Sequence, residues 1–156
     1  MNIFVLDNDL QKCAEYHCDK HTVKMILEYA QILSTNVRIV NDCEAGYKIT
    51  HRNHPCTIWA RQSLSNWLWL KKLSFHLNEE YKYRYGHVRN HKSYDVIESL
   101  PTPNIPDVGL TPFAQAMPDY CKSDNAVDAY RKYYVLEKKN IVNWKKRNVP
   151  SWYKLT

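Results

Sequence analysis

Residues 55–86 read PCTIWARQSLSNWLWLKKLSFHLNEEYKYRYG, and this stretch decides the expected fold. Pro55 suits the first turn of a helix, and Gly86 suits the position just after its C-terminal end. Apolar side chains surround much of the stretch between them, because residues 68–70 are Leu-Trp-Leu. A helix that is apolar on most sides usually lies at the centre of a bundle. The stretch therefore predicts one long central helix from Pro55 to about Tyr85.

Two further helices are predicted, one on each side of this stretch. Asp7 or Asn8 is a candidate N-terminal cap for a helix that runs to about Ser34. A third helix is predicted over about residues 125–144, with Asp124 as its candidate cap.

Residues 87–124 are expected to form a long connection between the second and third helices. Five of the seven prolines lie in residues 101–118, which excludes regular helix there. A loop of this length is usually functional or packed over a site. We expect an all-α fold, in which residues 1–156 form a single-domain bundle of three main helices with a long Pro-rich loop.

One stripe of the first predicted helix carries five polar side chains, His17, His21, Lys24, Glu28 and Gln31. Successive members are 4, 3, 4 and 3 residues apart, which places them on one face of a helix with about 3.6 residues per turn. We call this set the polar ladder. If it faces another helix it is a candidate active site, and if it faces water it is only the solvated side of an amphipathic helix.

The ladder supports two kinds of chemistry. In the first, an unprotonated Lys24 amine attacks a sugar C1′ or carbonyl carbon to form a Schiff base. Glu28, one turn away, then stabilises positive charge or activates water. A solvated Lys–Glu pair, worth about 0.2–0.5 kcal/mol, is the structural alternative.

The second kind is metal chemistry, because two histidines four residues apart can share one ion. No standard zinc spacing is present, so we expect no resident metal and no cofactor. A metal site would draw on these side chains: Cys13, His17, His21, His51, His54 and Cys56.

A second candidate site precedes Pro55, where the sequence is His51-Arg52-Asn53-His54. The N-terminus of the helix that follows offers unpaired N–H groups and the positive end of the helix dipole, and both favour an anion. Arg52 and the two histidines would reinforce phosphate binding there. The alternative is ordinary helix capping by Asn53 or His54.

The C-terminal segment is basic and aromatic. Residues 122–156 contain nine Lys/Arg and three Asp/Glu, so they account for the whole net charge of +6. This pattern suits a polyanion, most simply nucleic acid, and the alternative is a solubilising face. Trp152 either stacks on bases or anchors the tail in the core. The candidate contacts are Lys145, Lys146, Arg147, Trp152 and Lys154.

Composition excludes several other classes of protein. Only three glycines are present, and neither a GxGxxG nor a Walker motif occurs. No apolar run approaches the ~20 residues of a membrane-spanning helix. The five cysteines and the lack of a signal peptide favour reduced thiols and a cytoplasmic protein.

Three motifs resemble the phage pyrimidine-dimer DNA glycosylases of the endonuclease V type, which also act as AP lyases, and their bacterial cousins. Arg52-Asn53-His54-Pro55 opens the second helix, and Tyr83-Arg84-Tyr85-Gly86 ends it. Pro150-Ser151-Trp152-Tyr153-Lys154 is similar to the family's Pro-Thr-Trp-Tyr-Lys ending. The motifs are short but span most of the chain. The whole chain also resembles small phage proteins, so the expected location is the cytoplasm of a host cell.

The resemblance implies an all-α fold that binds duplex DNA and flips a nucleotide out of it. Such enzymes cleave the N-glycosidic bond with their N-terminal amine, assisted by a glutamate on the first long helix. Here residue 2 is Asn, which normally leaves Met1 in place, and the best register puts His21 or Lys24 nearer the glutamate's place than Glu28. The expected chemistry therefore belongs to the ladder and does not copy the family.

The leading hypothesis is an N-glycosylase or AP-lyase-like enzyme acting on a glycosidic bond of DNA or a nucleotide, with His17, His21, Lys24 and Glu28 as catalytic residues. One alternative is a non-catalytic DNA- or nucleotide-binding protein. The other is a metal-dependent hydrolase that uses the histidines. Neither a membrane partner nor a particular oligomeric state is predicted.

Overall fold

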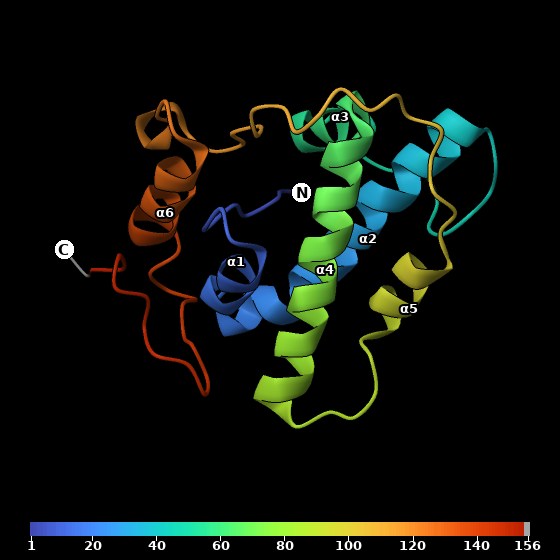
Figure 1. Ribbon diagram of the computed structural model, residues 1–156. Helices are drawn as coiled ribbons and strands as arrows, with labels where there is room; N and C mark the ends of the chain where they lie inside the picture. The colour runs from blue at the N-terminus through green and yellow to red at the C-terminus, as the bar shows by residue number, and fades with distance from the viewer. Residues whose placement is uncertain (155–156) are drawn as a thin grey trace.

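A computed structural model describes residues 1–154 and shows six α-helices, one short 3₁₀ helix and, within those residues, no strand (Figure 1). The predicted all-α class is confirmed, and the predicted number of three main helices is wrong. The elements are α1 (Leu10–Tyr16), α2 (Asp19–Asn41), α3 (Pro55–Gln62), α4 (Leu64–Tyr85), α5 (Lys92–Ser99), η1 (Asp119–Cys121) and α6 (Ala126–Glu137).

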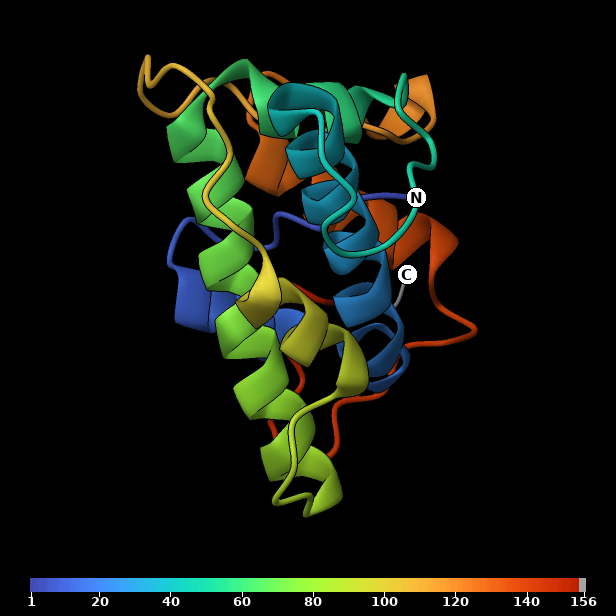
Figure 2. The same ribbon diagram turned by 90° about the vertical axis from the view of Figure 1, so that its right-hand side faces the viewer.

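Helix α4 is central, as the sequence predicts. It packs against α1, α2, α3 and α5, and its side chains Trp67, Leu70, Leu73 and Leu77 are fully buried. Figures 1 and 2 show α4 lying across α2, with α5 beside them and α6 on the far side of the N-terminal segment. Burial on most sides explains why no single polar face can be read from its sequence.

The predicted helix from Pro55 to Tyr85 is broken at Ser63. The Ser63 backbone is extended, with φ −155° and ψ 145°. Asp107, from the Pro-rich loop, accepts hydrogen bonds from the Ser63 hydroxyl at 3.1 Å and the Ser65 hydroxyl at 2.6 Å. The hydroxyls at the break thus bind an acceptor 44 residues away from Ser63 in the chain, and local propensity cannot reveal this contact.

The first predicted helix is also broken, at His17 and Cys18. The backbone of His17 is extended, with φ −60° and ψ 129°, and it ends α1. Arg84, which is fully buried, donates to the carbonyls of His17 and Glu15, each at 2.7 Å, and so satisfies groups that the break leaves free. The polar ladder is therefore not one stripe of a continuous helix, because His17 lies before the break.

The connection after Gly86 is partly helical, contrary to the prediction. Helix α5 is capped by His91, whose ring accepts from the backbone N–H of Ser93, and it buries Tyr94 and Ile97. It ends before the first proline of the cluster at residues 101–118, where the predicted absence of regular α-helix is confirmed.

Helix α6 begins one residue later than predicted and ends seven residues earlier. Asn125, not Asp124, caps it by accepting from the Asp128 backbone N–H at 3.2 Å. After Glu137 the chain turns back to pack on α1, and Trp144 donates its indole N–H to the Tyr16 carbonyl at 2.8 Å. In the described part of the chain, no helix is long and apolar enough to cross a membrane.

Candidate functional site

The N-terminal segment carries the α-amino group of Met1 to the side of α2. The amine nitrogen lies 3.0 Å from Oε1 of Glu28. A cavity of about 120 Å³ opens at this pair between the segment, α2 and α6. Its lining residues are Met1, Asn2, Phe4, His21, Lys24, Met25, Glu28, Tyr133 and Lys138.

Buried contacts fix the N-terminal segment in this place. Ile3 to Leu6 are at most 3% exposed, which agrees with the apolar run in the sequence. The side-chain amide of Asn2 donates to the Ala116 carbonyl at 2.8 Å. The backbone N–H of Phe4 donates to the Tyr29 hydroxyl at 3.1 Å. Because the segment is held by both its backbone and its side chains, the amine has a defined position.

Three of the four predicted catalytic side chains line this cavity. Glu28 is mostly buried, with 13% of its side chain exposed, whereas 66% of the Lys24 side chain is exposed. The Lys24 ammonium lies 4.0 Å from Oε2 of Glu28, so Glu28 contacts the α-amine more closely than the lysine. His21, the ladder residue that precedes Lys24, is 5% exposed.

The fourth predicted residue, His17, is in the core and does not line the cavity. Its Nδ1 lies 2.7 Å from the Cys13 carbonyl, and its Nε2 lies 2.8 Å from the Tyr29 hydroxyl. A carbonyl only accepts, so Nδ1 carries the proton and Tyr29 donates to Nε2. Burial lowers the pKa of His17 to about 4. Through Tyr29 this neutral histidine supports the segment that presents the amine.

The N-terminus of α3 lies beside the amine and Glu28. His54 caps the helix by accepting from the Cys56 backbone N–H at 3.1 Å, so the capping alternative describes this residue. Burial and the charge of the terminal amine lower the pKa of His54, while Glu28 acts in the opposite direction. His51, Arg52 and Asn53 are exposed at the same end. The sequence motif before Pro55 thus forms a polar, partly cationic border of the site.

The predicted basic contacts Lys146 and Arg147 lie outside the cavity, around the ends of α1 and α4. Arg147 forms ion pairs with Glu80 at 2.5 Å and with Glu15 at 3.3 Å. The Lys146 ammonium donates to the Tyr83 carbonyl at 3.1 Å. These contacts hold the tail on the bundle and neutralise part of the positive charge of the segment.

The last predicted contacts divide into one anchor and two exposed lysines. Trp152 packs edge-on against Tyr16, with ring centroids 5.7 Å apart, and also contacts Tyr134. It therefore anchors the tail, which was one of its two predicted roles. Lys145 and Lys154 are exposed.

The histidines do not form a metal site. Among residues 1–154, no three His, Cys, Asp or Glu side chains are grouped so that they could hold a metal ion. Both ring nitrogens of His17 are hydrogen-bonded within the core, and Nδ1 of His54 caps α3, so these nitrogens are not free to bind a metal ion. The described residues therefore give the metal-dependent hydrolase no ligand set.

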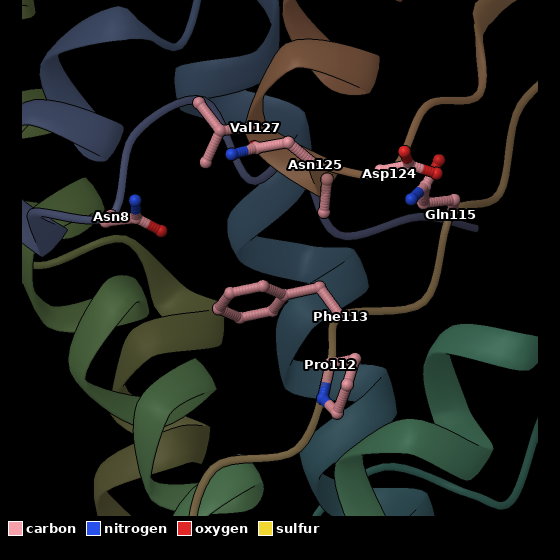
Figure 3. A pocket seen from close by; sticks show the side chains of 8 residues that line it. Asn8, Pro112, Phe113, Gln115, Asp124, Asn125 and Val127 are labelled. Atoms are coloured by element: carbon pink, nitrogen blue, oxygen red, sulfur yellow. The ribbon is translucent and has the colours of Figure 1, made fainter.

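A second hollow, of about 230 Å³, opens between the Pro-rich loop and the start of α6 (Figure 3). Phe113 and Asn125 lie at its sides, and Asp124 is the one ionisable side chain in its lining. Without a base or nucleophile to accompany this carboxylate, the hollow is not a candidate for catalysis.

Two features of the site escape sequence reasoning. The sequence predicts the polar ladder, and not the terminal amine, as the source of the nucleophile. The apolar run before Asp7 is the signal that the N-terminal segment is buried. Tyr133 and Lys138, more than 100 residues from Glu28, reach the cavity only because α6 packs there.

Comparison with known proteins gives one match. A model of the family described as pyrimidine dimer DNA glycosylase matches residues 1–93. The matched part contains the N-terminal segment, Glu28 and the start of α3, and it ends in the first turn of α5. Neither a curated protein nor a solved structure matches the chain. Because the match covers more than half of the 156 residues, the chain belongs to the pyrimidine dimer DNA glycosylase family.

Proposed function

We propose that this protein is a DNA N-glycosylase with an associated lyase step, and that the α-amine of Met1 is its nucleophile and Glu28 its acid–base partner. The observation that carries the proposal is the 3.0 Å contact between these two groups at the edge of a cavity. Membership of the family supports a glycosylase in general terms. The proposal replaces the ladder side chains with a backbone amine that the sequence reasoning set aside.

The chemistry follows from the two groups. Glu28 accepts a proton from the ammonium, which frees the lone pair of the amine to attack C1′ of the target deoxyribose. The bond from C1′ to the base breaks and its electron pair leaves with the base. As the sugar ring opens, a proton passes from the Met1 nitrogen through Glu28 to O4′, which gives a protonated Schiff base between C1′ and that nitrogen. The Glu28 carboxylate then takes a C2′ proton, and the electron pair of that bond expels the 3′ phosphate. A mostly buried carboxylate is also suited to stabilise the positive charge that develops at C1′.

Lys24 is the competing nucleophile, because it lies beside the same carboxylate. Borohydride reduction during incubation with an abasic duplex traps the Schiff base as a stable amine. Peptide mass spectrometry then locates the adduct, and the intact mass shows whether Met1 is the first residue of the purified protein. We expect the adduct on the Met1 nitrogen, and an adduct on Lys24 would contradict this assignment.

Glu28→Gln tests the carboxylate with little change in shape. Because an amide cannot accept the proton of the amine, we expect the rate of adduct formation to fall by about 10²–10⁴-fold. Glu79→Gln is the matched control, since Glu79 is an exposed glutamate on α4 that pairs with Lys82. No adduct and no base release by the wild type, across abasic, uracil-containing and ultraviolet-irradiated duplexes, would refute the glycosylase proposal.

A further inference from the structure

The ring of His21 has two different surroundings. On one side, Nδ1 lies 2.6 Å from the Tyr134 hydroxyl. The backbone N–H of Cys18 donates to the same hydroxyl at 3.2 Å. The other acceptor within reach of that hydroxyl is the Cys18 sulfur at 3.7 Å, a weaker and more distant one. The shorter contact and the stronger acceptor favour donation of the Tyr134 hydroxyl proton to Nδ1.

This arrangement decides where the imidazole carries its own proton. A ring nitrogen that accepts a hydrogen bond has no proton, so a neutral His21 holds its proton on Nε2. Burial lowers the pKa of His21 to about 3, and the charges of Lys138 and Lys24 act in the same direction. The ring stays neutral at physiological pH.

The second nitrogen, Nε2, has no hydrogen-bond partner within residues 1–154. It is not sealed from solvent. His21 lines the cavity together with Met1 and Glu28, and stacking on Phe4, with ring centroids 4.3 Å apart, fixes the ring plane. A buried and oriented N–H group thus opens onto the space where the amine and the carboxylate meet.

We propose that His21 binds the substrate sugar as an uncharged hydrogen-bond donor, with its Nε2–H directed to the ring oxygen of the deoxyribose, and that Tyr134 is the positioning residue that sets this tautomer. The inference rests on the proposed function, because it takes the sugar to be attacked at C1′ by the Met1 amine. The ring oxygen is bonded to C1′, so it enters the cavity with the reacting carbon.

A neutral donor suits this cavity better than a charged one. The terminal amine, Lys24 and Lys138 already place three cationic groups at the cavity. An imidazolium would add a fourth positive charge beside an amine that must lose its proton. A neutral N–H polarises the oxygen without that repulsion, as other enzymes achieve with a histidine whose pKa is lowered.

The inference gives α6 a part in the chemistry. Tyr133, Tyr134 and Lys138 all come from the α6 region, which lies beyond the residues that match the family model. The Tyr133 ring is also stacked with Phe4, at 6.1 Å between ring centroids. The C-terminal part of this chain therefore closes the cavity and orients a donor inside it.

Nitrogen NMR of the full-length protein labelled with ¹⁵N in its imidazoles reads the tautomer directly. We expect His21 to be protonated on Nε2 alone in the wild type and to lose this preference in Tyr134→Phe. Tyr133→Phe is the matched control, because it removes a neighbouring hydroxyl from the same wall, and it should leave the tautomer unchanged. A wild-type ring protonated on Nδ1 overturns the inference without using any activity measurement.

Binding of a duplex that contains a tetrahydrofuran abasic analogue tests the donor, since the analogue keeps the ring oxygen but cannot form a Schiff base. His21→Gln retains an N–H near the position of Nε2 and should bind like the wild type. His21→Asn moves the amide toward the position of Nδ1 and should bind about tenfold more weakly, the value of one hydrogen bond. Circular dichroism and thermal unfolding confirm that both variants are folded.

The outcomes separate the two proposals. If the wild type forms the borohydride adduct but His21→Asn binds the analogue as tightly as His21→Gln, the role of His21 is wrong and the proposed function stands. If the wild type forms no adduct, the proposed function fails whichever tautomer the spectrum shows.

Discussion

Acid should destabilise this protein well before its carboxylates are fully protonated, because two histidines are buried in the neutral form. Burial lowers the pKa of His17 to about 4 and that of His21 to about 3, from an ordinary value of 6.5. The unfolded chain therefore binds protons at a higher pH than the folded chain. The stabilisation is complete above about pH 6.5 and is lost as the pH falls from there toward the folded values.

The magnitude follows from these pKa values. Between pH 8 and pH 5, an unfolded histidine becomes almost fully protonated while both folded rings stay neutral. Each ring therefore lowers the free energy of unfolding by on the order of 2 kcal/mol between pH 8 and pH 5, and the two together lower it by about 4 kcal/mol. This is a large part of the about 5–15 kcal/mol that stabilises a typical domain.

Urea denaturation at several pH values from 8 to 5 measures the effect. His21→Gln removes one titrating group, so its loss of unfolding free energy over this range should be smaller than that of the wild type by about 2 kcal/mol. A wild-type free energy that changes by less than about 1 kcal/mol between pH 8 and pH 5 would refute the reasoning. An equal pH dependence in wild type and variant would refute the part assigned to His21.

Three further predictions concern the basic and buried side chains. Arg84→Met removes a buried ion pair with Glu80 and a partly buried one with Asp19, and it should lower the free energy of unfolding by about 3–5 kcal/mol. Lys82→Met breaks a more exposed pair and should change the free energy of unfolding by less than about 1 kcal/mol, so equal losses in urea denaturation would contradict this. Trp152→Ala should lower the free energy of unfolding by about 3 kcal/mol and leave the affinity of the folded protein for abasic DNA within about twofold of the wild type. Unchanged stability together with a weaker affinity would instead indicate base stacking. Wild-type DNA affinity should fall with salt, and Lys145→Ala should reduce the log–log slope by about 0.9; an unchanged slope would remove this lysine from the DNA interface.

Periodicity predicted what depends on local pattern. The apolar residues of α4 are spaced for burial on most sides, so the sequence predicted its central position. The sequence also predicted the absence of regular α-helix among the prolines. The polar ladder was likewise visible. Its three cavity residues His21, Lys24 and Glu28 lie on α2, where their spacing alone brings them to one face.

Both helix breaks were missed because their causes are distant in the sequence. Asp107 accepts the hydrogen bond of the Ser63 hydroxyl at one break, and Arg84 donates to the His17 carbonyl at the other. A residue in extended backbone between two helical stretches has no local signature when its hydrogen-bond partner is 44 or 67 residues away.

Residue spacings predicted the helical class, the central helix and Glu28 as a candidate carboxylate, because these features depend on positions only a few residues apart. Which amine that carboxylate contacts follows from the packing of distant segments of the chain. Met1 and Glu28 are 27 positions apart, and their 3.0 Å contact exists because the buried segment Ile3–Leu6 packs between α2 and α6. The same packing decided that His17 supports the core while His21 faces the cavity. A side chain's protonation and partners are set by what surrounds it in space, and no spacing along the chain contains that information.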